Sequence, residues 1–371
     1  MIKLSEKARR TLEKIVNEMR TKENVYGVGL FGSWSRGDAT KSSDIDLLIL
    51  DKGNFKHEFV ERTEINGLLI DLDHIPKQWL YGPMPPETDQ KIYEMQVLYD
   101  RDWSLTNMKL LMTKSYGSPE RVDIRTEAHI IESDIYLSRA TSAFAREDFQ
   151  SAQLFATMAL EKVLRVLMEI ALEPFSTSRF IQKLEESTTK LEMQNLFTGY
   201  LEISKLTRAD KADVEGKLKL FKAIWDEISF SASQNPQAFE SSHFMVKTKL
   251  KYYLNTAFLQ GTIIRTRFLI DSEKAIEATH YLKNILIDII ENYVWLKSSI
   301  NKVKMDYTTL MRSLENVEEK NPKNYKHTIN FLSLKDADKS KASDMIEKTR
   351  KIMIKTRKER KVLIKNHLLK S

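Results

Sequence analysis

Cysteine is absent from the 371 residues of this chain. This absence excludes disulfide bonds, thiolate metal sites and cysteine nucleophiles together. No run of about 18 apolar residues occurs, so the sequence offers no candidate for a membrane-spanning helix. The stretch from residue 1 to 19 is amphipathic and charged throughout, which is unlike a secretory signal. We therefore expect a cytoplasmic protein with no membrane contact.

The length and composition fit a globular protein with more than one domain. A chain of 371 residues is too long for one ordinary domain. Hydrophobic residues make up 42% of it and charged residues 30%, a balance rich in residues that favour helices. We expect three parts, over residues 1–120, 121–270 and 271–371.

The positive charge is concentrated at the C-terminal end. Residues 339–371 hold twelve lysine or arginine residues and three acidic ones, a net +9. The whole chain carries +7, so the first 338 residues sum to −2. Contact between this basic tail and RNA is one interpretation, and a solvated basic helix is the commoner one.

Short apolar runs alternate with helical patterns in the first 120 residues. Apolar positions at spacings of three and four predict a helix over residues 4–22. A proline-rich break at 83–88 is followed by a short helix. Four apolar runs predict strands, at 26–33, 44–51, 65–75 and 97–100. The pattern predicts a mixed α/β unit.

From about residue 124 prolines become scarce and helical periodicity takes over. We predict a loop at 318–340 and helices over 127–145, 148–172, 179–206, 211–230, 246–269, 272–300, 302–317 and 340–366. The predicted fold class is therefore α+β, with a mixed sheet and its helices at the N-terminus, followed by a large all-α helical-bundle region.

The stretch GSWSRGDATKSSDID, residues 32–46, places two carboxylates at the start of a buried strand. Asp44 and Asp46 alternate along that strand, so both side chains point to one face. Crowded carboxylates repel unless a cation lies between them. Magnesium takes oxygen ligands and is commonly held by one or two carboxylates together with substrate phosphates. The turn at Gly32 and Ser33 can bring backbone N–H groups and a hydroxyl close to such a phosphate.

A third carboxylate is expected on a neighbouring strand. Asp71 and Asp73 lie in LLIDLDHIP and share one face of their predicted strand. A third acid would complete a second metal site, or act as general base for an acceptor hydroxyl. The spacing alone leaves both residues as candidates.

These residues resemble the signature of the DNA-polymerase-beta-like nucleotidyltransferase superfamily. The signature is Gly-Ser, ten residues, then Asp-x-Asp, and it matches Gly32-Ser33 followed by Asp44-Ile45-Asp46. The spacing is similar to that of minimal nucleotidyltransferases and of the kanamycin nucleotidyltransferase branch. The resemblance covers about residues 5–110, where VLYDRDW resembles the strand that ends the domain. It aligns Asp71 with the family's third acid.

The resemblance implies a magnesium-dependent nucleotidyltransferase. An acceptor hydroxyl would attack the α-phosphate of a nucleoside triphosphate, expected to be ATP, and pyrophosphate would leave. Asp44 and Asp46 would hold two magnesium ions, and Asp71 would bind one of them and orient or deprotonate the acceptor. The nucleotide contacts would come from Gly32, Ser33, Arg36 and Ser43.

Three residues near the motif keep a second interpretation. Arg36 contacts the triphosphate or forms a structural ion pair. Trp34 lines the nucleotide pocket or packs in the core. Asp73 shares the role of Asp71, or lies outside the site.

Residues 124–180 resemble the helical domain of kanamycin nucleotidyltransferases or the related HEPN domain. The resemblance implies a role in forming the acceptor site and a homodimer. HEPN ribonucleases carry an Arg, four to six residues and a His, which these helices lack; Arg360 and His367 have that spacing by chance. Lys162 and Arg165 either contact the nucleotide or acceptor or, as we expect, face solvent.

Three hypotheses about the function remain open. In the first, the acceptor is a small molecule such as an aminoglycoside, and in the second it is RNA or a protein. The third is a catalytically inactive scaffold whose helices bind a partner protein or nucleic acid. Helices beyond residue 210 and the basic tail favour a larger acceptor. The sequence carries no motif that identifies the base.

Overall fold

The computed structural model describes residues 6–82, 84–207, 209–318 and 322–368. The described chain falls into two compact units. The first unit comprises the residues up to Ser118 together with Lys251–Arg265, and the second comprises Pro119–Leu250 and the residues from Thr266 onward. The division into 1–120, 121–270 and 271–371 stays a prediction.

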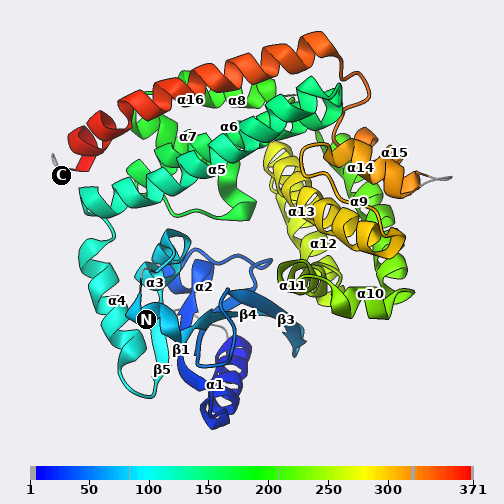
Figure 1. Ribbon diagram of the computed structural model, residues 1–371. Coiled ribbons are helices and arrows are strands. Elements are labelled where there is room, and N and C mark those ends of the chain that lie inside the picture. The colour runs from blue at the N-terminus through cyan, green and yellow to red at the C-terminus, as the bar shows by residue number, and fades with distance from the viewer. Residues whose placement is uncertain (1–5, 83, 208, 319–321, 369–371) are drawn as a thin grey trace. The chain divides into compact units, whose positions relative to one another are not determined.

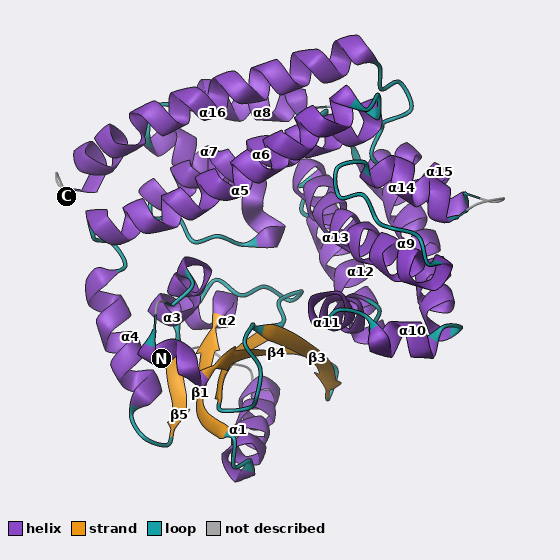
Figure 2. Cartoon of the chain, in the orientation of Figure 1, coloured by secondary structure: helices purple, strands orange, loops and turns teal. Residues whose placement is uncertain are grey.

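A five-stranded mixed sheet forms the centre of the first unit, in the order β3-β4-β2-β1-β5 (Figure 2). Strands β2 and β4 are parallel, and the other neighbouring pairs are antiparallel. The register of β2 and β4 sets Asp46 beside Asp71. The strands are β1 (Val25–Phe31), β2 (Ile45–Asp51), β3 (Phe59–Ile65), β4 (Leu68–Pro76) and β5 (Gln96–Asp100).

Strand β2 is buried on both faces because its apolar side chains alternate between two layers of helix. Leu47 and Ile49 pack with α1 (Glu6–Thr21) on one face. Leu48 and Leu50 lie in the cluster on the other face, which includes residues of α3 (Asp89–Glu94) and α4 (Ser104–Ser115). Short helices complete the unit: α2 (Gly32–Arg36), η1 (Lys77–Tyr81) and η2 (Pro86–Thr88).

Every regular element described in the second unit is a helix. Helices α5 (Pro119–Ala145) and α6 (Phe149–Ile170) lie side by side, and α16 (Lys339–Leu368) packs along both (Figure 1). The others are η3 (Thr177–Arg179), α7 (Phe180–Lys190), α8 (Gln194–Ile203), α9 (Lys211–Ser233), α10 (Pro236–Ser241), α13 (Ala275–Asn301), α14 (Leu310–Val317) and α15 (Lys323–Phe331). Helices α11 (Phe244–Tyr253) and α12 (Thr256–Asp271) contribute to both units. The mixed sheet and the helical region confirm the predicted α+β class.

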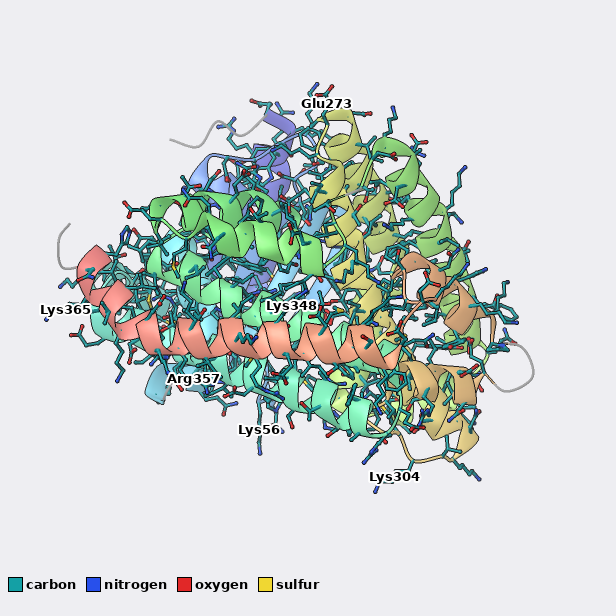
Figure 3. All side chains as sticks on the ribbon, turned by 90° about the horizontal axis from the view of Figure 1, so that it is seen from above. Lys56, Glu273, Lys304, Lys348, Arg357 and Lys365 are labelled. Atoms are coloured by element: carbon teal, nitrogen blue, oxygen red, sulfur yellow. The ribbon has the colours of Figure 1, made fainter. Side chains whose placement is uncertain are left out.

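The basic tail is largely α16, whose buried residues recur every three or four positions. Arg360 is buried and forms ion pairs with Asp123 and Glu127 of α5. These contacts give Arg360 a structural role. Lys348 and Lys365 also lie along this helix (Figure 3). None of the described helices combines the length and apolar character that a membrane crossing requires.

Several predicted boundaries were wrong. The segment after the predicted strand at 44–51, for which no element was predicted, contains β3. The predicted loop at 318–340 contains α15, with residues 319–321 outside the described part. The predicted helix over 179–206 is two helices, because Glu192 adopts a left-handed conformation at φ 58°. The predicted helix over 4–22 is described from Glu6 onward, and its first two residues lie outside the description.

A buried charged network joins two helices of the second unit. Glu161 on α6 accepts a hydrogen bond from Arg165 at 2.8 Å and contacts Nε2 of His280 on α13 at 3.1 Å. The Glu161 side chain is only 8% exposed. Burial alone would raise the pKa of Glu161, but the charges and hydrogen bonds of His280 and Arg165 hold this pKa well below its ordinary value of 4.5.

Because of this network, we predict that the free energy of unfolding depends on pH in the acidic range. Because the folded pKa of Glu161 is depressed, its stabilisation is fully present above pH 4.5 and is lost as the pH falls through the folded value. Glu161→Gln should lower the free energy of unfolding at neutral pH by about 3 kcal/mol. Denaturant titrations should show this difference shrinking as the pH is lowered below 4.5. The exposed Glu185→Gln is the control, and a difference independent of pH would contradict the prediction.

Candidate active site

Three carboxylates meet where β2 begins beside β4. Asp44 directly precedes β2, Asp46 is the second residue of that strand, and Asp71 is its partner on β4. One carboxylate oxygen from each residue lies within 4.8 Å of the others. The side chains of Asp44 and Asp71 are each 10% exposed, and Asp46 is partly buried, so two of the three acids are shielded from most of the solvent.

The negative charges of the cluster perturb one another. Burial raises the pKa of Asp46 well above its ordinary range, and the charges of Asp44 and Asp71 raise it further. Burial also opposes ionisation of Asp44, but Arg265 and Arg62 hold the pKa of Asp44 below its ordinary value. Repulsion is therefore strongest at Asp46.

Two arginines and a tyrosine contact this cluster. Arg62 on β3 donates Nε to Asp71 Oδ1 at 2.6 Å, and its Nη2 donates to Oδ2 of both Asp71 and Asp44 at 2.5 Å. Arg265 on α12 donates Nη2 to Asp44 Oδ1 at 2.5 Å. The hydroxyl of Tyr252 on α11 donates to Asp71 Oδ2 at 3.1 Å.

None of these three residues was predicted from the sequence. Arg265 lies 221 positions from Asp44, and no spacing rule connects them. Arg62 had a signal: Asn66 and Gly67 form the turn between β3 and β4, and Asn-Gly between two runs is a strong indication of a hairpin. That hairpin places Arg62 opposite Asp71.

The donor set fits a divalent cation that prefers oxygen ligands. Each of the three residues offers a carboxylate oxygen, as magnesium and manganese require. The negative charges of Asp44 and Asp71 repel a negative charge on Asp46, and a bound cation would reduce this repulsion.

The Gly-Ser turn forms the start of α2. Gly32 has φ +73°, and a Cβ at this position would collide with a carboxylate oxygen of Asp46. The Gly32 N–H donates to Glu94 Oε1 on α3 at 2.8 Å. The same carboxylate accepts 2.8 Å hydrogen bonds from Arg36 Nη1 through both of its oxygens. Arg36 therefore forms the structural ion pair, and its contact with a nucleotide stays a prediction.

Two serines of the motif shape the backbone around the acids. The Ser43 hydroxyl accepts a 2.9 Å hydrogen bond from the Thr40 N–H, which closes the loop that leads to Asp44. The Ser33 carbonyl accepts from the N–H of Gly37 at the end of α2. Their binding to a nucleotide stays a prediction.

Asp73 and Trp34 lie outside the three-acid cluster. Asp73 points to the same face of β4 as Asp71, but Lys91 on α3 donates to it at 2.5 Å. Trp34 packs against the apolar cluster that includes α1. The geometry thus groups Asp71, and not Asp73, with the Asp-x-Asp pair.

Lys162 and Arg165 do not face solvent as expected, and that prediction was wrong. Each side chain is only 18% exposed within the second unit. Lys162 is paired with Glu132 of α5, and Arg165 with Glu161. Helix α6 is covered by α5 and α16, so its polar residues meet partners rather than water.

Comparisons with known proteins bear on the same residues. A family model described as a nucleotidyltransferase domain matches residues 12–98, which include the Gly-Ser turn and the three acids. A Methanocaldococcus jannaschii protein, whose name carries a provisional assignment as a protein adenylyltransferase, is 35% identical over 79 residues, 19% of this chain and 77% of that protein. The chain belongs to the nucleotidyltransferase domain family.

Membership in this nucleotidyltransferase family confirms the superfamily predicted from the motif. It also makes nucleotidyl transfer the general class of reaction. The crystal structure of a nucleotidyltransferase-like protein from Exiguobacterium sibiricum aligns with 88% of this chain and 91% of its own, at 11% identity and a TM-score of 0.33.

Gly32→Ala should disrupt the site of this nucleotidyltransferase. A left-handed φ costs about 1 kcal/mol for a residue with a Cβ, and the new methyl group would also displace Asp46. Gly37→Ala is the matched control, because φ is +83° but no atom lies within 4 Å of the added Cβ. Denaturant titration should show a loss of about 1 kcal/mol for Gly37→Ala and about 3 kcal/mol for Gly32→Ala. Equal losses would contradict the prediction.

Proposed function

We propose that this nucleotidyltransferase moves a nucleoside monophosphate from ATP to an acceptor hydroxyl, in a magnesium-dependent reaction that releases pyrophosphate. The observation that carries the proposal is the cluster of Asp44, Asp46 and Asp71 beside the turn at Gly32. Carboxylates that hold a metal and a glycine turn that accepts phosphate are the two parts that phosphoryl transfer needs.

In the proposed reaction Asp44, Asp46 and Asp71 would hold two magnesium ions. Magnesium, when bound, would offset the charge of the triphosphate and of the leaving pyrophosphate. The Gly32 N–H donates to Glu94, so Gly32 would contribute the close backbone approach that glycine allows. The Ser33 backbone and the Ser43 hydroxyl would position the phosphates.

Asp71 would orient the acceptor hydroxyl or take its proton. The acceptor oxygen forms a bond to the α-phosphorus as the bond from that phosphorus to the pyrophosphate oxygen breaks. Pyrophosphate leaves with the electron pair of the broken bond.

We propose a protein hydroxyl as the acceptor, because the Methanocaldococcus jannaschii relative is named for protein adenylyltransferase activity. RNA held by the basic residues of α16 and a small molecule such as an aminoglycoside are the alternatives. A homodimer and a cytoplasmic location stay predictions.

The test is transfer of label from ATP carrying a radioactive α-phosphate. The purified chain is incubated with magnesium and, separately, with mixed protein, RNA and aminoglycosides, and each of the other three nucleoside triphosphates is then compared with ATP. Label on protein that needs magnesium and is absent with Asp46→Asn is the expected result. Label on RNA or on an aminoglycoside would show that this molecule, and not a protein, is the acceptor. Absence of label from every triphosphate would contradict the proposal.

A catalytically inactive scaffold is the second candidate, and one observation favours it. Arg62 and Arg265 already provide cations to Asp44 and Asp71. A permanent pairing of this kind would hold both oxygens of Asp44 and of Asp71 in arginine hydrogen bonds and so weaken these two acids as metal ligands. Binding of neither magnesium nor manganese by the full chain would favour the scaffold.

A further inference from the structure

The carboxylate oxygens of the proposed metal site are divided unequally between two arginines. Both oxygens of Asp71 accept hydrogen bonds from Arg62, whereas Asp44 gives one oxygen to Arg62 and the other to Arg265. Two guanidinium groups therefore bind carboxylates that a divalent cation would need. A divalent cation at these oxygens would lie close to the positively charged guanidinium groups and repel them, so the metal and the arginines compete for the carboxylates.

Arg62 is held from several sides. Its guanidinium lies 5.2 Å from the ring centroids of both Tyr252 and Phe258. The Asn255 side chain donates to the Arg62 carbonyl at 2.9 Å. The Arg62 side chain is 4% exposed and donates three hydrogen bonds to carboxylates. These contacts make Arg62 a fixed part of the site.

Arg265 is more exposed than Arg62. Its hydrogen bond to Asp44 is short, and its contact with the Ser42 carbonyl is long, at 3.4 Å. Its side chain is 18% exposed, which leaves room for it to turn toward solvent. Of the two arginines, Arg265 is the one that a metal ion can displace at the lower cost.

We propose that Arg265 is a built-in competitor of the divalent cation. Its guanidinium pairs with the Asp44 carboxylate in the metal-free protein, and this ion pair breaks when the metal binds. The segment Lys251–Arg265, far from the motif in sequence, thereby sets the metal affinity of the site. This inference rests on the proposed function, because it concerns the regulation of the same site.

The test is manganese binding to the full chain, measured by calorimetry. Arg265→Gln should bind manganese about tenfold more tightly than wild type, the change expected from removing one charge-assisted hydrogen bond. Arg267→Gln is the matched control, because Arg267 is an exposed arginine on the same helix, and the substitution changes the net charge equally. It should leave the affinity unchanged.

A second measurement follows Arg265 itself. Magnesium titrated into the nitrogen-15-labelled wild type should shift one arginine Nε signal, assigned by its absence from the spectrum of Arg265→Lys. This measurement needs no charge-removing variant, so it decides the proposal even where Arg265→Gln fails to fold.

The outcomes separate the two proposals. Equal or weaker manganese binding by Arg265→Gln, or an Arg265 signal that magnesium does not move, would overturn the competition and leave the proposed function standing. Failure of wild type and variants alike to bind either metal would overturn both.

Discussion

Asp46→Asn should abolish nucleotidyl transfer while leaving the protein at least as stable as wild type. The substitution removes a metal ligand, so the rate should fall by about 10³-fold or more. Asp46 is also the acid that burial and the neighbouring charges of Asp44 and Asp71 disfavour most. Removing its charge relieves that repulsion and should raise the free energy of unfolding by about 1 kcal/mol. Activity falls because a metal ligand is lost, and stability rises because one of three mutually repelling carboxylates is removed.

Two other substitutions serve as comparisons for Asp46→Asn. Asp44→Asn removes a carboxylate that pairs with both Arg62 and Arg265, so it should lose activity and stability together. Asp73→Asn removes one of the two carboxylates that pair with Lys91, the other being Glu58, but no member of the cluster, so it should lose stability and keep activity. Transfer of α-phosphate label and denaturant titration measure both quantities. Retained transfer in Asp46→Asn would exclude it as a metal ligand.

The strands and acids of the site could be predicted because local rules determine them. The apolar run after Asp46 is typical of a strand buried on both faces. The alternation of Asp44 and Asp46 is a property of extended backbone. The choice between Asp71 and Asp73 could not follow from alternation, since both point to one face. It depends on Lys91, which lies on α3 and pairs with Asp73.

The residues that neutralise the site could not be predicted from the motif. Arg265 and Tyr252 contact the acids from a segment whose predicted helix showed only an apolar repeat. Their contribution depends on the chain returning to the first unit after more than a hundred residues in the second. Gly32 shows the opposite case. Its place in the motif was evident, yet the reason for glycine is the left-handed φ and the approach of Asp46.

Arg62→Gln should be the most destabilising substitution in the first unit. It leaves Asp44 and Asp71 buried beside each other and beside Asp46 without their shared cation. Removing one partner of a buried ion pair costs about 3–5 kcal/mol, because the charge left behind remains desolvated. Arg10→Gln on α1 is the control, since the Arg10 side chain is 75% exposed and should contribute little.

Magnesium should restore part of the stability that Arg62→Gln loses. A cation bound by the three acids replaces the missing positive charge, so the gain in stability on adding magnesium should be larger for Arg62→Gln than for wild type. Arg62→Lys keeps the charge but loses the paired geometry, and it should fall between the two. Denaturant titrations with and without magnesium measure these differences. An equal response to magnesium in wild type and Arg62→Gln would mean that the metal does not bind where the arginine neutralises the acids.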